Sequence, residues 1–285
     1  MYMGVGRLYI FGFPLVRSSS MCIRGASEGC PYNRLMTVCQ SIHSQKSWSK
    51  QISQIDHLYG QILYSIFQPL TDEEQQTYQV VLGALLSLKN PLSLQGLQEL
   101  LSFHVDMRKP WLVKAAVQAF QCVLAEIEDE KPLRFHHQSF YDFFKDGTSR
   151  SVAAIRSVSG QQKDICTVDI LKESANLCLA SLQMMNTQLH FNIGKVQSSF
   201  QFNEELPDLD VSPALSYSCQ YWTLHLEDLT PGEMLEQQVL EAGKRFLNEK
   251  FLYWLEVMSR QNSMRIVAGL LLALSRKFKV GHHRF

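Results

Sequence analysis

The chain has 285 residues, and its 27 basic and 27 acidic residues give a formal net charge of +0 at pH 7. This length is enough for one large or two ordinary domains, and a hydrophobic fraction of 46% is typical of a globular protein. A net charge of zero gives no bulk attraction to nucleic acid or to an anionic membrane. The seven cysteines form no CxxC pair and favour a reduced, cytoplasmic chain with buried thiols such as Cys166 and Cys178.

Two apolar runs are too short to cross a bilayer, which needs roughly 18–20 apolar residues. Residues 8–16 (LYIFGFPLV) are interpreted as a buried strand or helix end rather than the core of a signal peptide. Residues 266–274 (IVAGLLLAL) are interpreted as the buried part of a helix that ends in a basic tail. We therefore expect no membrane partner.

Apolar residues at helical spacing predict the first helices. Thr71 and Glu74 have the spacing of a capping box, and Asn90-Pro91 ends the helix that they begin. Ser93 is expected to cap the next helix, and Pro110 suits the first position of another. The predicted helices are residues 31–44, 54–67, 71–89, 93–101 and 110–121.

A β-hairpin and a short helix are expected to follow. Residues 122–127 and 133–136 alternate weakly around an acidic turn, and residues 132–144 (PLRFHHQSFYDFF) predict a strand, a polar turn and an aromatic-faced helix. Three helices and a hairpin in this order predict a winged helix. Its candidate recognition helix contains Trp111 and Leu112, which we expect to pack in the core.

Residues 147–162 are rich in Ser and Gly and are interpreted as a linker. Beyond them we expect only helices, with Ser212-Pro213 starting one of them. The predicted fold class is mainly α: a winged-helix-like module with a short β-hairpin, followed by a C-terminal helical domain. The predicted division is 1–68 (connecting helices), 69–147 (winged-helix-like module), 148–161 (linker) and 162–285 (helical domain).

The motifs of common active sites are absent from the sequence. No G-x-x-x-x-G-K-[ST] loop, H-E-x-x-H or G-x-S-x-G occurs. The pair Gly4 and Gly6 lacks the context of a phosphate loop, and Cys22, Cys30 and Cys39 lack the spacing of zinc ligands. We expect no enzyme activity, no ATP or GTP binding, no cofactor, and no catalytic, cofactor-binding or metal-binding residue.

The segment 132–144 holds the side chains that most resemble a site. Adjacent His136 and His137 would point to opposite faces of a strand, so one is expected to be buried and one solvated. Ser139 is expected to cap the short helix, with Asp142 in its first turn, rather than to act as a nucleophile. Three further residues, Phe140, Phe143 and Phe144, are expected in the core. Residues 126–130 are interpreted as a solvated hairpin tip rather than a calcium site.

Several segments match one family in order. They are residues 6–11 (GRLYIF), Pro31, Arg34 and Leu35, residues 55–63 (IDHLYGQIL), 82–94, 132–144, 178–179, 189–193 (LHFNI), 217–226 (YSCQYWTLHL) and 251–259 (FLYWLEVMS). As a set, they resemble the region downstream of the NACHT core, a winged helix plus helical domain, in fungal NACHT (STAND) NOD-like receptor proteins. The resemblance covers nearly the whole chain.

The resemblance implies that complete relatives sense a signal through C-terminal repeats and switch by nucleotide exchange in the NACHT core. The Walker segments would lie before Met1, and His136 stands where the family has Leu. The predicted function is a non-enzymatic regulatory or scaffolding segment of a cytoplasmic NACHT-type signalling protein, or a truncated product of such a gene. Its expected partner is protein, either a NACHT core or another chain.

Two alternatives stay open at this point: a winged-helix DNA-binding regulator and an uncharacterised enzyme. Phosphate contacts dominate the affinity of proteins for DNA. The candidate wing has Glu126, Glu128, Asp129 and Glu130 beside Lys131 alone, so it would be repelled by phosphates. We therefore expect no nucleic-acid partner.

Overall fold

The structure is a computed structural model that describes residues 9–10, 13–14 and 53–282, with gaps at 126, 129, 146–147, 160–165, 199 and 230–233. Within these residues the fold is mainly helical, as predicted. The α-helices are α2 (Gln54–Phe67), α3 (Asp72–Ser87), α4 (Leu94–Leu101), α5 (Val113–Ala119), α6 (Gln138–Lys145), α7 (Thr148–Ser159), α8 (Ile170–Gln188), α9 (Pro213–Glu227), α10 (Met234–Glu249), α11 (Phe251–Arg260) and α12 (Met264–His282). Two 3₁₀ turns lie at η1 (Pro110–Leu112) and η2 (Asn203–Glu205).

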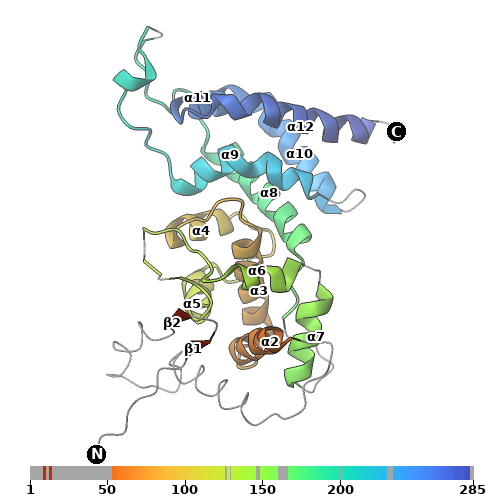
Figure 1. The fold of residues 1–285 in the computed structure, drawn as a ribbon. Helices are drawn as coiled ribbons and strands as arrows, with labels where there is room; N and C mark the ends of the chain where they lie inside the picture. Colours follow the sequence, from red (N-terminus) through yellow and green to blue (C-terminus); the bar gives the residue numbers. More distant parts are fainter. Residues whose placement is uncertain are drawn as a thin grey trace, which may run out of the picture.

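Near the amino terminus, β1 (Tyr9–Ile10) pairs antiparallel with β2 (Phe13–Pro14), and Ile10 faces Phe13 in the register. Figure 1 shows the helices in two groups joined at a waist. Helices α2 to α7 form the N-terminal part, and α9 to α12 lie above them. The long helix α8 crosses the waist and packs against α3 and α4 on one side and α9 and α10 on the other. We call α8 to α12 the C-terminal part.

The predicted helix starts are confirmed where a cap fixes them. Thr71 accepts a hydrogen bond from the Glu74 amide, and its own amide donates to the Glu74 carboxylate at 2.9 Å. Ser93 accepts from the amide of Gly96 at the start of α4, and Ser212 accepts from Leu215 at the start of α9. Each cap satisfies an amide that the first turn of a helix would otherwise leave unpaired.

The expected β-hairpin is not supported. Residues 122–127 and 133–136 form one isolated antiparallel bridge, between Leu124 and Phe135. The cause is the turn that follows α5, in which the amides of Val123 and Leu124 still donate to the carbonyl of Phe120. The first strand therefore has too few extended residues to continue the pairing, and the amide of Leu133 donates instead to the carbonyl of Leu92.

The linker expected at 148–161 is helical over residues 148–159, where α7 lies. Ser151, Ala154 and Ile155 are buried at helical spacing against α2, a pattern that the Ser- and Gly-rich composition concealed. Gly60 of α2 permits the contact, because a Cβ at that position would lie 2.8 Å from the carbonyl oxygen of Ala154. This segment is a packed element of the N-terminal part.

Aromatic residues of α6 anchor that helix in the N-terminal core, as expected. Phe140, Phe143 and Phe144 are at most 2% exposed. The ring of Phe140 lies 5.0 Å from that of Tyr59 and 5.1 Å from that of Phe135. Such edge-to-face and tilted contacts add to the burial of apolar area.

We predict that Phe140→Ala lowers the free energy of unfolding by about 3–5 kcal/mol, since it leaves a cavity among these rings. Asp142→Ala is the matched control on the same helix. Asp142 is partly exposed and accepts a 3.4 Å hydrogen bond from Gln138, and a single exposed hydrogen bond of this kind contributes about 1 kcal/mol or less. Urea unfolding of both variants checks this order. A larger loss for Asp142→Ala would show that its carboxylate has a structural partner that our account omits.

Candidate functional site

The side chains singled out in residues 132–144 lie around the start of α6, where Nδ1 of His137 is 2.7 Å from the hydroxyl of Ser139. His136 and His137 are both exposed, so the expectation that one is buried is wrong. The ring Nδ1 of His137 accepts a hydrogen bond from the Ser139 amide at 3.0 Å, so His137 caps α6 and Ser139 does not. The Ser139 hydroxyl lies 2.6 Å from that of Tyr59. Asp142 accepts from Gln138, one turn along α6 rather than in its first turn, and does not complete a nucleophile–base–acid chain.

The candidate recognition helix also differs from the expectation. Trp111 is 72% exposed, so the expectation that it packs in the core is wrong. The reason is its position in η1, ahead of the buried face that begins at Val113. Lys109 forms an ion pair with Glu73 at 3.0 Å. In the candidate wing, two of the four acidic residues lie outside the described part of the chain.

A buried histidine, His225, lies in the last turn of α9. It is fully buried, and each ring nitrogen has a hydrogen-bond partner. Ser174 of α8 lies 2.7 Å from Nδ1, and the hydroxyl of Tyr217 lies 2.7 Å from Nε2. Ser174 also donates to Asp228 at 2.6 Å. Lys89, just after α3, contacts both ends of this set of hydrogen bonds. Its ammonium donates to Asp228 at 2.8 Å, and its amide donates to the Tyr217 hydroxyl at 3.0 Å.

We call these five residues, Lys89, Ser174, Tyr217, His225 and Asp228, the junction chain, because they join the two parts of the protein. The hydrogen bonds of the junction chain allow one consistent assignment of donors and acceptors. Ser174 donates its only proton to Asp228, so it accepts from His225, whose Nδ1 must be protonated. Nε2 is then the acceptor for Tyr217, which accepts in turn from the Lys89 amide. The hydrogen bonds thus run toward the carboxylate, an arrangement in which each bond polarises the next.

The charges of the junction chain follow from burial and from these bonds. Burial and the charge of Lys89 lower the pKa of His225 to about 3, so the imidazole is neutral. Burial alone would raise the pKa of Asp228, but hydrogen bonds from Lys89 and Ser174 and the charge of Lys89 outweigh burial and hold that pKa below its ordinary value. Burial also raises the pKa of Tyr217. Within the junction chain, only Lys89 and Asp228 are therefore charged, and they form an ion pair.

A second contact joins the same two parts deeper in the protein. His104, which follows α4, accepts a hydrogen bond from the Asp106 amide at Nδ1, so its proton is on Nε2. That nitrogen lies 2.8 Å from the carboxylate of Glu173 on α8, close although not aligned for an ideal hydrogen bond. Glu173 also packs on Gly83 of α3, where a Cβ would lie 2.8 Å from Cγ of Glu173. Glycine at this position allows α8 to approach α3 closely.

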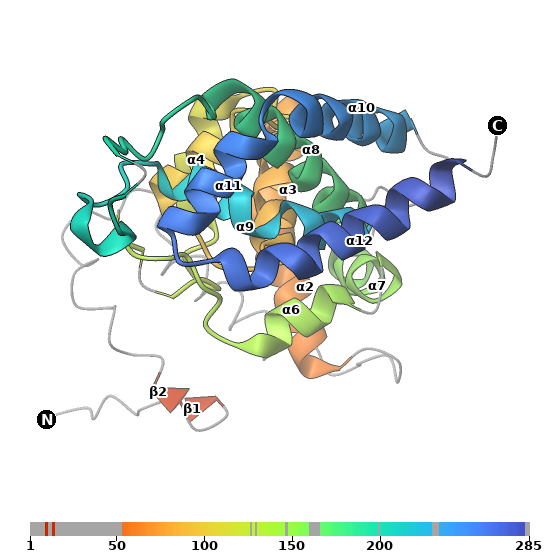
Figure 2. The same cartoon turned by 90° about the horizontal axis from the view of Figure 1, so that it is seen from above.

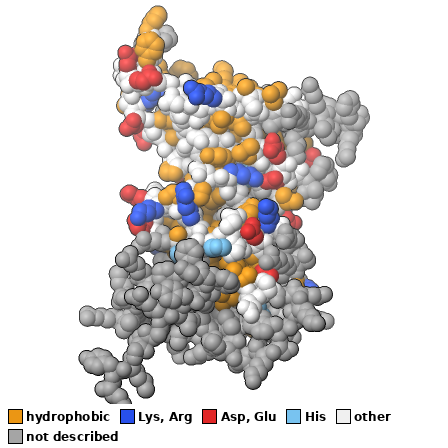
Figure 3. All heavy atoms as spheres, viewed as in Figure 1, with side chains coloured by type: hydrophobic (Ala, Val, Ile, Leu, Met, Phe, Trp, Pro, Cys, Tyr) orange, Lys and Arg blue, Asp and Glu red, His pale blue; other side chains and the backbone are white. Residues whose placement is uncertain are grey.

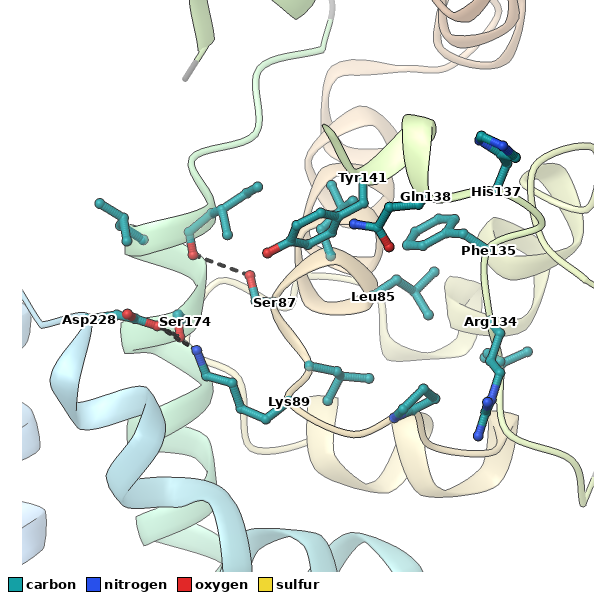
Figure 4. A pocket seen from close by; sticks show the side chains of 16 residues that line it. Leu85, Ser87, Lys89, Arg134, Phe135, His137, Gln138, Tyr141, Ser174 and Asp228 are labelled. Atoms are coloured by element: carbon teal, nitrogen blue, oxygen red, sulfur yellow. Dashed lines mark hydrogen bonds and ion pairs between the residues drawn. The ribbon is translucent and has the colours of Figure 1, made fainter. Parts of the chain in front are cut away.

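A cavity of about 480 Å³ opens at this junction, next to Lys89 and Asp228. Figure 4 shows Tyr141, Gln138 and Phe135 on one side of it and Ser174 with Asp228 across from them. Its wall is mixed: Leu85, Leu86, Leu88, Pro91, Leu133, Ile170 and Leu171 supply apolar surface, and Ser87, Arg134 and His137 add polar groups. Arg134 is exposed and makes no ion pair within the described residues. The cavity therefore presents groups of both parts to one ligand.

Nothing in the described residues is arranged as a metal centre, since no group of three or more His, Cys, Asp and Glu is placed to hold an ion. Among the helices that the structure describes, none combines the length and apolarity that a bilayer span requires. Among the described cysteines, Cys166, Cys178 and Cys219 are buried, and burial raises the pKa of the Cys166 and Cys219 thiols. The buried thiols thus agree with the expectation for Cys166 and Cys178.

Sequence reasoning missed the junction chain. Its members span residues 89 to 228 and share no motif, and only the folded chain brings them together. One local feature pointed to it: His225 and Ser174 are polar residues on helices whose neighbouring turns are apolar. A polar residue within an apolar helical stripe indicates a buried partner.

The lowered pKa of His225 predicts a pH dependence of stability. Below pH 6.5, the ordinary value, the unfolded chain protonates this histidine, whereas the folded chain stays neutral until about pH 3. Above pH 6.5 the neutral His225 costs no stability. As the pH falls from 6.5 toward 3, the free energy of unfolding falls by up to about 1.4 kcal/mol per pH unit. Gln can accept from Tyr217 and donate to Ser174 but does not titrate. Urea unfolding between about pH 7 and pH 4 should therefore show a flatter profile for His225→Gln, and equal slopes would mean that folding does not lower the pKa of the imidazole.

No family model matches the chain, and no solved structure matches it. A curated relative, the vegetative incompatibility protein HET-E-1 of Podospora anserina, is 27% identical over 237 residues, which cover 78% of this chain. The chain spans only 17% of the length of that relative. HET-E-1 is a fungal NACHT/STAND protein. The similarity supports a relationship between this chain and fungal NACHT proteins.

Proposed function

We propose that this chain is a non-enzymatic regulatory and scaffolding segment of a NACHT-type signalling protein. The observation that carries the proposal is the similarity to HET-E-1 over 78% of the chain. This similarity is consistent with the ordered set of sequence segments that resembles the region downstream of a NACHT core. In this role the chain positions a partner rather than transforming a substrate.

The junction supplies a physical means for such a role. The junction chain holds the end of α3 against α8 and α9 through hydrogen bonds, and the His104–Glu173 contact holds the segment after α4 against α8. Buried polar groups are costly when unpaired, so the two parts favour one relative orientation. A segment with a defined orientation can hold a docked domain in a defined place.

The cavity at the junction is the proposed docking site for a protein partner, either a NACHT core or another chain. Its apolar wall suits an aliphatic or aromatic side chain, and the exposed guanidinium of Arg134 suits a carboxylate beside it. Because Tyr141 belongs to the N-terminal part and Leu171 to the C-terminal part, one inserted segment contacts both. Docking in the cavity would therefore depend on the relative orientation of the two parts and would stabilise it.

The proposal that the chain is not an enzyme is supported by the state of its reactive groups. His225 is neutral, and both of its nitrogens are occupied by Ser174 and Tyr217. The raised pKa of the Cys166 and Cys219 thiols disfavours the thiolate, which is the nucleophilic form. Exposed His137 is engaged in capping α6. These groups serve structure in the described part of the chain.

Binding to a NACHT core tests the proposed function. The core of a fungal NACHT protein, produced as a separate chain, is titrated with this chain in a calorimeter. We predict that Arg134→Ala and Tyr141→Ala each weaken binding by about tenfold, as loss of an interface anchor typically does. The matched control is Arg245→Ala, since Arg245 is an exposed arginine of α10 that does not line the cavity.

Two outcomes would contradict the proposal. Absence of binding at about 100 μM core, weaker than typical signalling contacts, would remove the NACHT core as a partner. An equal loss for Arg245→Ala would remove the cavity as the docking site. In the same series, micromolar magnesium-dependent binding of a fluorescent ATP analogue by this chain alone would oppose the non-enzymatic role, because no phosphate loop is present in its sequence.

A further inference from the structure

The wall of the cavity at the junction carries one unpaired cationic side chain. Lys89 and Asp228 neutralise each other through their ion pair at 2.8 Å. Arg134 is exposed, and its guanidinium makes no ion pair or hydrogen bond within the described residues. Asp228, the one acidic residue among the described residues that line the cavity, lies across from Arg134 in Figure 4. The Arg134 side of the cavity is therefore free to bind an anion.

The rest of the wall leaves apolar surface uncovered. Leu171, at the start of α8, is 58% exposed, and the rings of Phe135 and Tyr141 are partly exposed. Figure 3 shows hydrophobic and basic side chains side by side near the waist of the molecule. Removing apolar surface from water is the main source of affinity in small-molecule sites. The cavity therefore suits an occupant with an apolar body next to its negative group.

The size of the cavity suits a small molecule. Its volume, about 480 Å³, lies within the roughly 300–1,000 Å³ of pockets that bind small ligands. The hydroxyl of Tyr141 has no hydrogen bond within the described residues, so it can donate to an oxygen of the occupant. Because Arg134 and Tyr141 belong to the N-terminal part and Leu171 to α8, the walls that such a molecule covers come from both parts of the protein.

A carboxylate fits this cavity better than a phosphate. The planar guanidinium of an arginine binds a carboxylate through two parallel hydrogen bonds, and one arginine balances its single charge. A phosphate monoester carries a charge of about −1.5 to −2 at pH 7 and would need a second free cation. Lys89 is not free for this role, because its ammonium is already paired with Asp228.

We propose that this cavity binds a small apolar carboxylic acid, and that the acid excludes the protein partner. The carboxylate accepts hydrogen bonds from Arg134, and the apolar body covers Leu171 and the ring of Tyr141. Exclusion rests on the function proposed above, because the docked partner uses the same side chains. Binding of the acid does not depend on that function. The concentration of the acid then controls how much of the chain is free to dock.

Binding of phenylbutyrate to the full chain tests the site. The acid is titrated into the isotope-labelled protein and followed by NMR chemical shifts, with its neutral amide, phenylbutyramide, as the matched ligand. For a molecule of about a dozen non-hydrogen atoms we expect a Kd on the order of 1 mM or tighter. The amide and the Arg134→Gln variant should each bind at least about tenfold more weakly. Arg245→Gln should bind as wild type does, because Arg245 does not line the cavity.

Four results would overturn the site. They are no saturable binding of the acid at about 10 mM, equal binding of the amide, an equal loss for Arg245→Gln, and tighter binding of inorganic phosphate than of the acid. Arg134 is exposed, so its variant should fold, which circular dichroism verifies.

Competition tests the exclusion separately. At ten times its own Kd, the acid should raise the apparent Kd of the NACHT core for this chain by about tenfold. An acid that binds but leaves the affinity for the core unchanged would overturn the exclusion. If the core does not bind at all, the function proposed above fails, and the titration of the chain alone still decides whether the cavity is a carboxylate site.

Discussion

The contact between Asp228 and its two donors is the interaction on which the arrangement of this protein depends. Lys89 comes from the end of α3, Ser174 from α8, and Asp228 follows α9, so one carboxylate joins three elements and both parts of the chain. His225 and Tyr217 extend this contact inward, to the amide of Lys89. Removing Ser174, Tyr217 or His225 would leave a buried polar atom without its partner, which costs more than the bond itself contributes. The Lys89–Asp228 pair is partly exposed, so its own contribution is smaller.

The bonds to Asp228 also decide which atom donates and which accepts in the rest of the junction chain. A neutral His225 with its proton on Nδ1 is the state that satisfies all of the donors and acceptors together. A protonated imidazole would place a donor against the Tyr217 hydroxyl, which already receives the Lys89 amide and would have to turn its own proton elsewhere. The parts are therefore held by a set of bonds with one arrangement, and the cavity beside them keeps a defined shape.

Features that depend on residues close together in the sequence could be predicted, and features that depend on distant residues could not. The capping residues Thr71, Ser93 and Ser212 were predicted, because a cap involves residues three apart. The hairpin was not supported, because the turn after α5 continues through Leu124 and no pattern of alternation reveals that. The helix α7 was mistaken for a linker, because its buried face has a single large apolar residue, Ile155, beside Ser151 and Ala154. The junction chain was missed, because its members are up to 139 residues apart.

We infer that the junction chain couples the two parts of the protein into one cooperative unit. Hydrogen–deuterium exchange, followed by mass spectrometry, measures the opening of α3 and α9 separately in one sample. In Lys89→Met, which keeps the apolar stem and removes the charge, the account predicts that protection falls in α9 and in α3 together. A loss of protection confined to α9 and the residues around Asp228, with α3 unchanged, would contradict the coupling.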